Sequence, residues 1–223
     1  MYSIKGFKST VFAKEVFMPR DKSENHEKIV DAAYEEFMTY GFVDASMRRI
    51  ASNCQMSASG LYKHFSGKED MFASLVEPAY NGLKEKYNQI LDKEYADIKN
   101  KTAEDIWEGD EENVWVTKFI YDNYNAFKLL VCKSQGTAYE NFIHELASME
   151  EKATIEYIEK LKENGIKTNP IPKKELHLFV TSNINAIFET VVHDFSKKEA
   201  IAYAKRLDEY CVAGWKRIFG LAE

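Results

Sequence analysis

The stretch SASGLYKHFSGKED, residues 57–70, concentrates hydroxyl, phenol, imidazole and ammonium groups that can bond to phosphates and to base edges. Read as a helix that begins at its first serine, it places Leu61 and Phe65 on one face, because positions i and i+4 lie together. Tyr62 and Lys63 then lie on other faces. One side is therefore expected to be anchored in a core, while the other is open for binding.

Two helices are predicted before this stretch. Residues with the spacing i, i+4, i+8 and i+11 predict an amphipathic helix that Gly41 can end: Ile29, Ala33, Phe37 and Tyr40. Ser46 is suited to cap a second helix, barely two turns long, with four inward positions: Met47, Ile50, Ala51 and Cys54. Ser57 can cap the third. Two short helices joined by a tight turn form a helix-turn-helix, whose second helix can enter the major groove of DNA.

A fourth helix is predicted to start at the S-x-x-E motif of Ser66 and Glu69, which has the form of a capping box. Its apolar stripe is Phe72, Leu75, Val76 and Ala79. Pro78 falls inside this pattern, where proline removes a backbone N–H and clashes with the preceding turn. The helix is therefore expected to kink or restart between Ser74 and Pro78.

The composition favours a globular all-α chain. Its 223 residues are 45% hydrophobic and 13% aromatic, which is ample for a packed core, and glycine and proline are few. Cys54, Cys132 and Cys211 have no CxxC spacing, so neither a disulfide framework nor a cysteine-rich zinc site is expected. No apolar run approaches the length that spans a bilayer, and the start of the chain lacks a signal-peptide pattern. We therefore expect a cytoplasmic protein with no membrane partner.

The charge distribution is uneven in a way that suits a nucleic-acid partner. The whole chain carries −6, yet residues 46–68 contain four basic residues and no acidic one. This window is +4, which leaves −10 on the remainder (−6 minus +4). The basic residues lie where a DNA-binding protein would need them.

The segment KIVDAAYEEFMTYGFVDASMRRIASNCQMSASGLYKHFSGKEDMF, Lys28 to Phe72, resembles the DNA-binding head of the tetracycline-repressor (TetR) family of bacterial transcription regulators. The resemblance implies a three-helix head and a C-terminal helical bundle for ligand binding and dimerisation. The expected domains are an extension over 1–22, the head over 23–72 and the bundle over 73–223. Gln55 replaces the glycine that the family commonly has in the turn, so it must adopt a left-handed or otherwise less favoured backbone.

The resemblance also implies which residues contact DNA. Ser46, Tyr62 and Lys68 correspond to phosphate contacts of the family. Arg48 could read a guanine bidentately or neutralise a phosphate, and His64 could contact DNA or serve only the structure; both questions stay open. The full expected set is Ser46, Arg48, Ser57, Ala58, Ser59, Gly60, Tyr62, Lys63, His64 and Lys68.

The bundle is expected to hold an effector pocket and a dimer interface. The candidate pocket residues are Trp107, Trp115, Phe119, Tyr124, Tyr139, Glu140, His144, Asn183, Phe188 and His193. Glu140 and His144 are four residues apart and could pair, bind a cation or polarise an effector, but two residues do not make a metal site. The candidate interface residues are Ile184, Ile187, Val191, Ala204, Leu207, Cys211, Gly214, Trp215 and Ile218.

The hypothesis that follows is a dimeric DNA-binding transcriptional regulator, most often a repressor in this family, released from a palindromic DNA operator by a small-molecule effector. An alternative is a regulator of the same kind that a protein partner controls. An enzyme is not expected, because glycine-rich phosphate loops, G-x-S-x-G, H-E-x-x-H and Cys/His ligand clusters are missing from the sequence, and no cofactor is implied. Residues 1–17 are either a disordered extension or a basic arm that touches phosphates.

Overall fold

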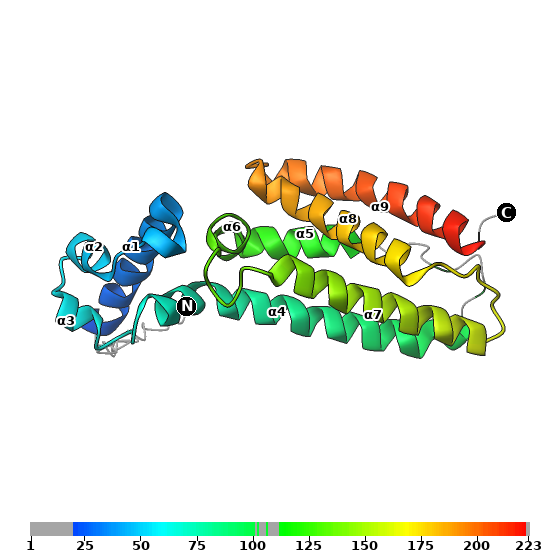
Figure 1. Ribbon diagram of the computed structural model, residues 1–223, viewed down its shortest axis with the longest axis horizontal. Helices are drawn as coiled ribbons and strands as arrows, with labels where there is room; N and C mark the ends of the chain where they lie inside the picture. The colour runs from blue at the N-terminus through cyan, green and yellow to red at the C-terminus, as the bar shows by residue number, and fades with distance from the viewer. Residues whose placement is uncertain (1–19, 101, 103–105, 107–111, 222–223) are drawn as a thin grey trace, which may run out of the picture.

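A computed structural model describes residues 20–100, 102, 106 and 112–221, with side chains from residue 26 onward; the proposed N-terminal arm lies outside them. The described residues form helices and connecting turns and contain no strand, which confirms the all-α class. The α-helices, shown in Figure 1, are α1 (Arg20–Asp44), α2 (Met47–Asn53), α3 (Ala58–Leu61), α4 (Lys68–Asp97), α5 (Glu112–Asp122), α6 (Tyr124–Lys133), α7 (Phe142–Glu163), α8 (Lys173–Val192) and α9 (Lys197–Phe219). A 3₁₀ turn, Ile98–Asn100, follows α4.

The molecule is elongated, with a small head at one end and a helical bundle at the other (Figure 1). Helices α1 to α3 and the start of α4 form the head, and the rest of α4 runs along the bundle beside α7. Within the bundle α7 packs on α8, and α5 packs on α9. Helix α6 lies between the two parts, because it contacts α1, α4 and α8.

An aromatic cluster joins the head core to the bundle core. The ring of Phe72 meets the edges of Phe37 and Phe42, with centroids 5.1 and 5.6 Å apart. On its other side Phe72 lies 6.3 Å from the ring of Tyr139, in the turn before α7. Phe72 is fully buried, and the head and the adjoining bundle residues belong to one continuous apolar core.

The turns of the head match the expected backbone at two positions. Gly41 has φ +72° and ends the regular part of α1, and Gln55 has φ +57°, the left-handed conformation that a non-glycine residue seldom adopts. Tyr40, expected in the apolar stripe, is instead half exposed and lies under the guanidinium of Arg49 at 4.2 Å. Its phenol is better placed in water than in the core.

The expected start of α4 is wrong by one residue. Gly67 occupies the N-cap position, and the helix begins at Lys68. Ser66 donates from its backbone N–H (2.8 Å) and its hydroxyl (3.2 Å) to Asp70 rather than to Glu69. At the start of α4, Asp70 therefore takes the place that the sequence assigned to Glu69.

Two other helix boundaries differ from the expectation. Helix α4 does not restart at Pro78: both Ser74 and Pro78 lie on its exposed face, so water can satisfy the Ser74 carbonyl that loses its helical donor. The helical spacing of Val116, Ile120, Tyr124, Phe127 and Val131 predicts one helix, whereas the structure has two, α5 and α6, broken at Asn123. The Asn123 side chain donates to the Phe119 carbonyl at 3.0 Å, which competes with helical bonding.

Candidate nucleic-acid interface and bundle cavity

Two buried apolar side chains anchor helix α3 and the turn after it in the head core, and a serine caps the N-terminus of the helix. Leu61 and Phe65 are buried in the head core, as their spacing predicts. The Ser57 hydroxyl accepts a hydrogen bond from the Gly60 N–H at 3.0 Å. The regular helix ends at Leu61, and a turn continues to His64, whose N–H donates to the Leu61 carbonyl at 2.9 Å. The recognition element is therefore one short helix plus a turn.

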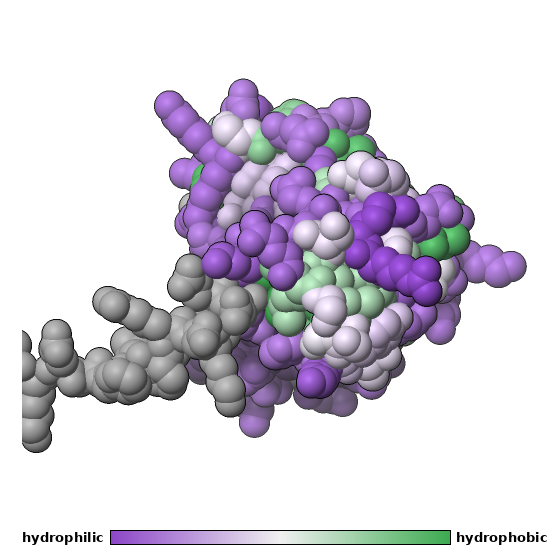
Figure 2. All heavy atoms as spheres, turned by 90° about the vertical axis from the view of Figure 1, so that its left-hand side faces the viewer, coloured by the Kyte–Doolittle hydropathy of each residue, from purple (hydrophilic) through white to green (hydrophobic). Residues whose placement is uncertain are grey.

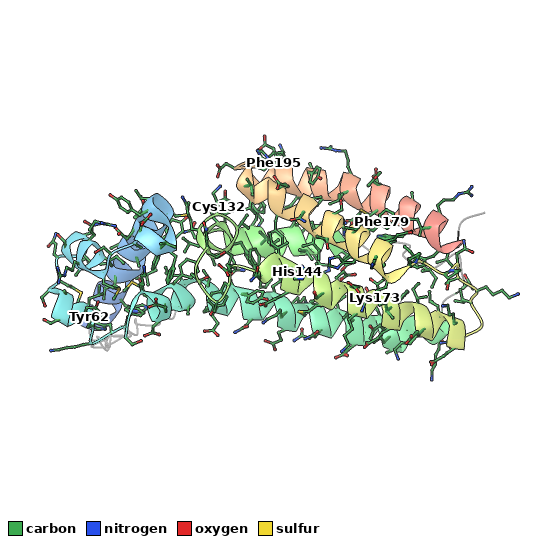
Figure 3. The ribbon with its side chains drawn as sticks, in the orientation of Figure 1. Tyr62, Cys132, His144, Lys173, Phe179 and Phe195 are labelled. Carbon is green, nitrogen blue, oxygen red and sulfur yellow. The ribbon has the colours of Figure 1, made fainter. Side chains whose placement is uncertain are left out.

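Several polar residues expected to touch DNA are exposed on α2, on α3 and in the turn that follows α3. Tyr62 is 53% exposed and is labelled at the head end of the molecule in Figure 3, and Arg48, Lys63 and His64 are exposed as well. Among the short residues, Ser57 and Ser59 are exposed while Ala58 and Gly60 are half-buried. Figure 2 looks onto this end of the molecule, where hydrophilic side chains surround a paler central area.

A buried carboxylate ties α2 to α1. Glu36, whose side chain is 1% exposed, accepts the Ser46 N–H at 2.7 Å and the Arg49 Nε–H at 2.8 Å through its Oε1. The Arg49 Nη2 also donates to the Asp44 carbonyl at 2.6 Å. The Ser46 hydroxyl makes no capping bond, so this side chain is left for another partner. Sequence reasoning missed Glu36; an acidic residue next to Phe37 inside the apolar stripe was the available signal.

Lys68 has a structural partner in addition to its expected phosphate role. Its ammonium donates to the carbonyls of Phe42 (3.0 Å) and Val43 (2.7 Å) at the end of α1 and lies 4.7 Å from the Phe42 ring centroid. Cations are favoured at such carbonyl-rich helix ends. An ammonium has three donors, so a phosphate contact remains compatible with these two bonds.

We expect Lys68→Met to weaken binding to all DNA sequences and also to lower head stability by about 1 kcal/mol. Methionine keeps the apolar stem over Phe42 but removes the bonds to both carbonyls. The measurements are urea unfolding and the slope of log affinity against log salt, which should fall by about 0.9 for one lost phosphate contact. A lower stability with an unchanged salt slope would restrict Lys68 to its structural role.

The bundle contains a cavity of about 60 Å³ between α4, α5, α7 and α8. Three residues expected in the effector pocket line it: Trp115, Asn183 and Phe188. Ile184, expected at the dimer interface, also lines this cavity, and Leu83 and Leu146 add aliphatic wall. The cavity is therefore mainly apolar with few polar groups, as ligand cavities are.

Glu150 and Tyr87 form a hydrogen-bonded pair in the wall of the cavity. The Tyr87 hydroxyl donates to Glu150 Oε2, and the Thr154 hydroxyl donates to Oε1 at 3.2 Å. Burial raises the pKa of the Glu150 carboxyl, and these hydrogen bonds oppose the shift; burial likewise raises the pKa of Tyr87. Sequence reasoning missed both residues, although Glu150 interrupts the apolar stripe between Leu146 and Ala153.

Most other expected pocket residues lie elsewhere, and Trp107 lies outside the described residues. Phe119 packs edge-on against Phe127, Tyr124 donates to Asp194 at 3.0 Å, and Tyr139 packs between Phe72 and Tyr80. Exposed His193 pairs with Glu189. The expected Glu140–His144 pair does not form, because Glu140 accepts the Gly136 N–H and His144 faces the ring of His177. No cluster of three metal-ligating side chains occurs among the described residues.

The outer face of α8 and α9 forms an apolar groove of about 490 Å³. Phe179 (45% exposed) and Tyr210 (77% exposed) lie along it with Cys211, Gly214, Trp215 and Ile218. Figure 3 labels Phe179 on α8. Four expected interface residues are buried by packing within one subunit: Ile187, Val191, Ala204 and Leu207. Of these, Leu207 also lines the groove. None of the helices that the described residues form has the length and apolar content of a membrane span.

Comparisons with known proteins agree with this fold. Residues 29–75 match the model of the bacterial regulatory proteins, tetR family. Over 82 residues the chain is 30% identical to the HTH-type transcriptional regulator SAB2452 of Staphylococcus aureus (strain bovine RF122 / ET3-1), covering 37% of this chain. The match spans 44% of that relative, less than half of its length.

Solved structures share the arrangement of helices at low sequence identity. The transcriptional regulator FadR of Bacillus subtilis, solved in complex with stearoyl-CoA, superposes with a TM-score of 0.52 at 19% identity, covering 85% of this chain and 98% of FadR. The TetR-family regulator PfmR of Thermus thermophilus gives a TM-score of 0.52 at 18% identity, with 81% of this chain and 97% of PfmR covered. Residues 29–75 therefore match the tetR family of bacterial regulatory proteins in sequence, and the chain as a whole shares its helical fold with solved regulators such as PfmR.

Proposed function

We propose that the protein is a dimeric repressor that binds a palindromic DNA operator and is released from it by a small molecule bound in the bundle. The observation that carries the proposal is the group of exposed polar side chains of α2 and α3, fixed on the buried residues Leu61 and Phe65. The proposed DNA contacts are the ten residues named from the sequence, with Tyr62 and Lys68 on phosphates. The proposed domain boundary falls near Phe72, where the aromatic cluster joins the two parts.

Dimerisation is part of the proposal because one head spans few base pairs. Two half-sites about 34 Å apart give useful specificity only when two heads are linked. The α8–α9 groove is the proposed interface: its exposed aromatic residues would be covered by the same face of a second copy. Five of the residues expected at the interface line this groove: Leu207, Cys211, Gly214, Trp215 and Ile218.

Effector binding in the cavity is proposed to change the position of the head through α6. Lys128 of this helix donates to the Val191 carbonyl at 2.8 Å and to Asp194 at 2.7 Å, which ties α6 to the end of α8. The same helix packs on α1 of the head. An effector that displaces α8 would therefore move α6 and change the spacing of the heads, provided that it binds one spacing more tightly than the other.

Selection from random 30-base-pair duplexes, followed by fluorescence anisotropy with the selected duplex, tests the proposal. We expect a palindromic site, a protein dimer per duplex and tight binding without any added compound. Selection that yields no preferred sequence would contradict the operator-binding function.

We expect Arg48→Ala to relax discrimination at one symmetric base-pair position, at a cost of about 1 to 3 kcal/mol there, if Arg48 reads a guanine. Its exposed guanidinium has no ion pair among the described residues, whereas that of Arg49 is held by Glu36. Affinities for a set of single-base operator variants measure the effect. An equal loss on every sequence would assign Arg48 to a phosphate instead.

A further inference from the structure

The bundle cavity holds a carboxyl group that no described lysine or arginine neutralises. Glu150 accepts hydrogen bonds from two neutral hydroxyls, those of Tyr87 and Thr154. The described residues that line the cavity include a second acidic residue, Glu112, but no basic one. Glu150 is half-buried, and removing a carboxylate from water without a nearby cation is disfavoured, so desolvation raises the pKa of Glu150.

A hydrogen-bond donor of the same cavity also lacks a partner. The indole Nε1–H of Trp115 is buried, and no described residue accepts a hydrogen bond from it. Buried indole groups normally find an acceptor, because an unmade bond carries the full desolvation cost. Most of the remaining wall is aliphatic and aromatic and includes Leu83 and Phe188.

We propose that this cavity binds a small organic cation, an ammonium compound that also carries a hydrogen-bond acceptor. The cation neutralises Glu150, the acceptor takes the Trp115 N–H, and the aromatic side chains of the wall favour a positive charge. This inference rests on the proposed effector function, since it assigns the chemical class of that effector.

Other ligand classes leave the cavity chemistry unsatisfied. An anionic ligand would add a third acidic group beside Glu112 and Glu150. A neutral ligand could bond to Trp115 but would offer Glu150 no charge pairing, which an ammonium group supplies. The volume of about 60 Å³ restricts the ligand to few non-hydrogen atoms unless the helices separate. The charge of −10 outside residues 46–68 also attracts cations to this part of the chain.

The test compares charged compounds with neutral ones of the same shape on the full chain. Choline is paired with 3,3-dimethyl-1-butanol, in which carbon replaces the nitrogen, and 3-hydroxypropylammonium is paired with 1-butanol, in which a methyl group replaces the ammonium group. Calorimetric titration measures binding, and anisotropy with the selected operator duplex measures release. We expect each cation to bind and its neutral counterpart to bind at least about tenfold more weakly. If neither cation binds, or if the neutral compounds bind equally well, the proposal is overturned.

Three variants test whether Glu150 is the negative charge that binds the cation. Glu150→Gln keeps the size of the side chain and one acceptor oxygen but removes the charge, and choline affinity should fall by about 30-fold. Trp115→Phe removes the N–H donor together with part of the ring system and should weaken choline binding by about fivefold, and 3,3-dimethyl-1-butanol binding to the same variant measures the share due to lost packing. The matched control is Glu145→Gln: Glu145 accepts from Tyr80 at 2.6 Å, also between α4 and α7, but does not line the cavity.

The controls also separate this inference from the function on which it rests. Operator binding without any amine should be the same for Glu150→Gln and the unchanged protein. Choline affinity that is unaltered in Glu150→Gln would overturn the cation site while leaving repressor function intact. Absence of operator binding by the unchanged protein would instead contradict the repressor function, whatever the amines do.

Discussion

Gly214→Glu is expected to convert the protein to a monomer and to weaken operator binding by about 10³-fold, the gain that a second linked head provides. Gly214 lies in the α8–α9 groove within helix α9, and an added Cβ would meet nothing within 4 Å. The isolated subunit therefore tolerates the change, and replacing a glycine inside a helix even favours it by about 0.5 to 1 kcal/mol. In a dimer, the new carboxylate would be buried against the apolar face of the partner.

Sedimentation velocity and anisotropy with the selected operator measure both effects, and the matched control is Ala202→Glu. Ala202 is an exposed residue of the same helix and does not line the groove, so the same charge there should leave the dimer and its affinity unchanged. An intact Gly214→Glu dimer would place the interface on another face.

The head could be predicted closely because local rules determine it. Ser57 caps α3, Leu61 and Phe65 point into the core, and Gly41 and Gln55 adopt the positive φ that the turns require. Each of these features depends on residues a few positions apart. The shift from Glu69 to Asp70 at the start of α4 shows the limit, since two neighbouring acidic residues can serve the same cap.

The bundle was less predictable because its site depends on contacts between distant segments. Apolar periodicity marks Ile187 and Ala204 as inward-facing, but it does not distinguish the core of one subunit from an interface between two. The side chain of Lys68 reaches carbonyls 25 and 26 residues away, and Glu150 meets Tyr87 from another helix. Neither partner follows from spacing along one helix. Sequence reasoning therefore identified some residues of the cavity wall, including Trp115, but missed Glu150, the carboxyl group of the same cavity.

Glu36→Ala is expected to lower the free energy of unfolding by about 2 kcal/mol and to weaken operator binding on every sequence. The carboxylate of Glu36 is 1% exposed and accepts hydrogen bonds from the Ser46 N–H and from Arg49. Alanine would leave the Ser46 donor at the start of α2 without its partner and would release Arg49. Because Arg49 is itself 45% exposed, water can solvate its freed guanidinium, so the loss falls below that of a fully buried ion pair.

The DNA effect should be indirect, since Glu36 lies beneath α2 and would not touch DNA. The loss of affinity is therefore expected to be uniform among operator variants and to leave the salt slope unchanged, because no phosphate contact is removed. Glu35→Ala is the matched control: the neighbouring residue has the same type but is exposed. Urea unfolding and salt titration with both variants separate the outcomes. Equal stability of the two variants would show that the Glu36 network does not hold α2 in place, and Ser46 and Arg48 would then have to be positioned by the packing of Met47 and Ile50 alone.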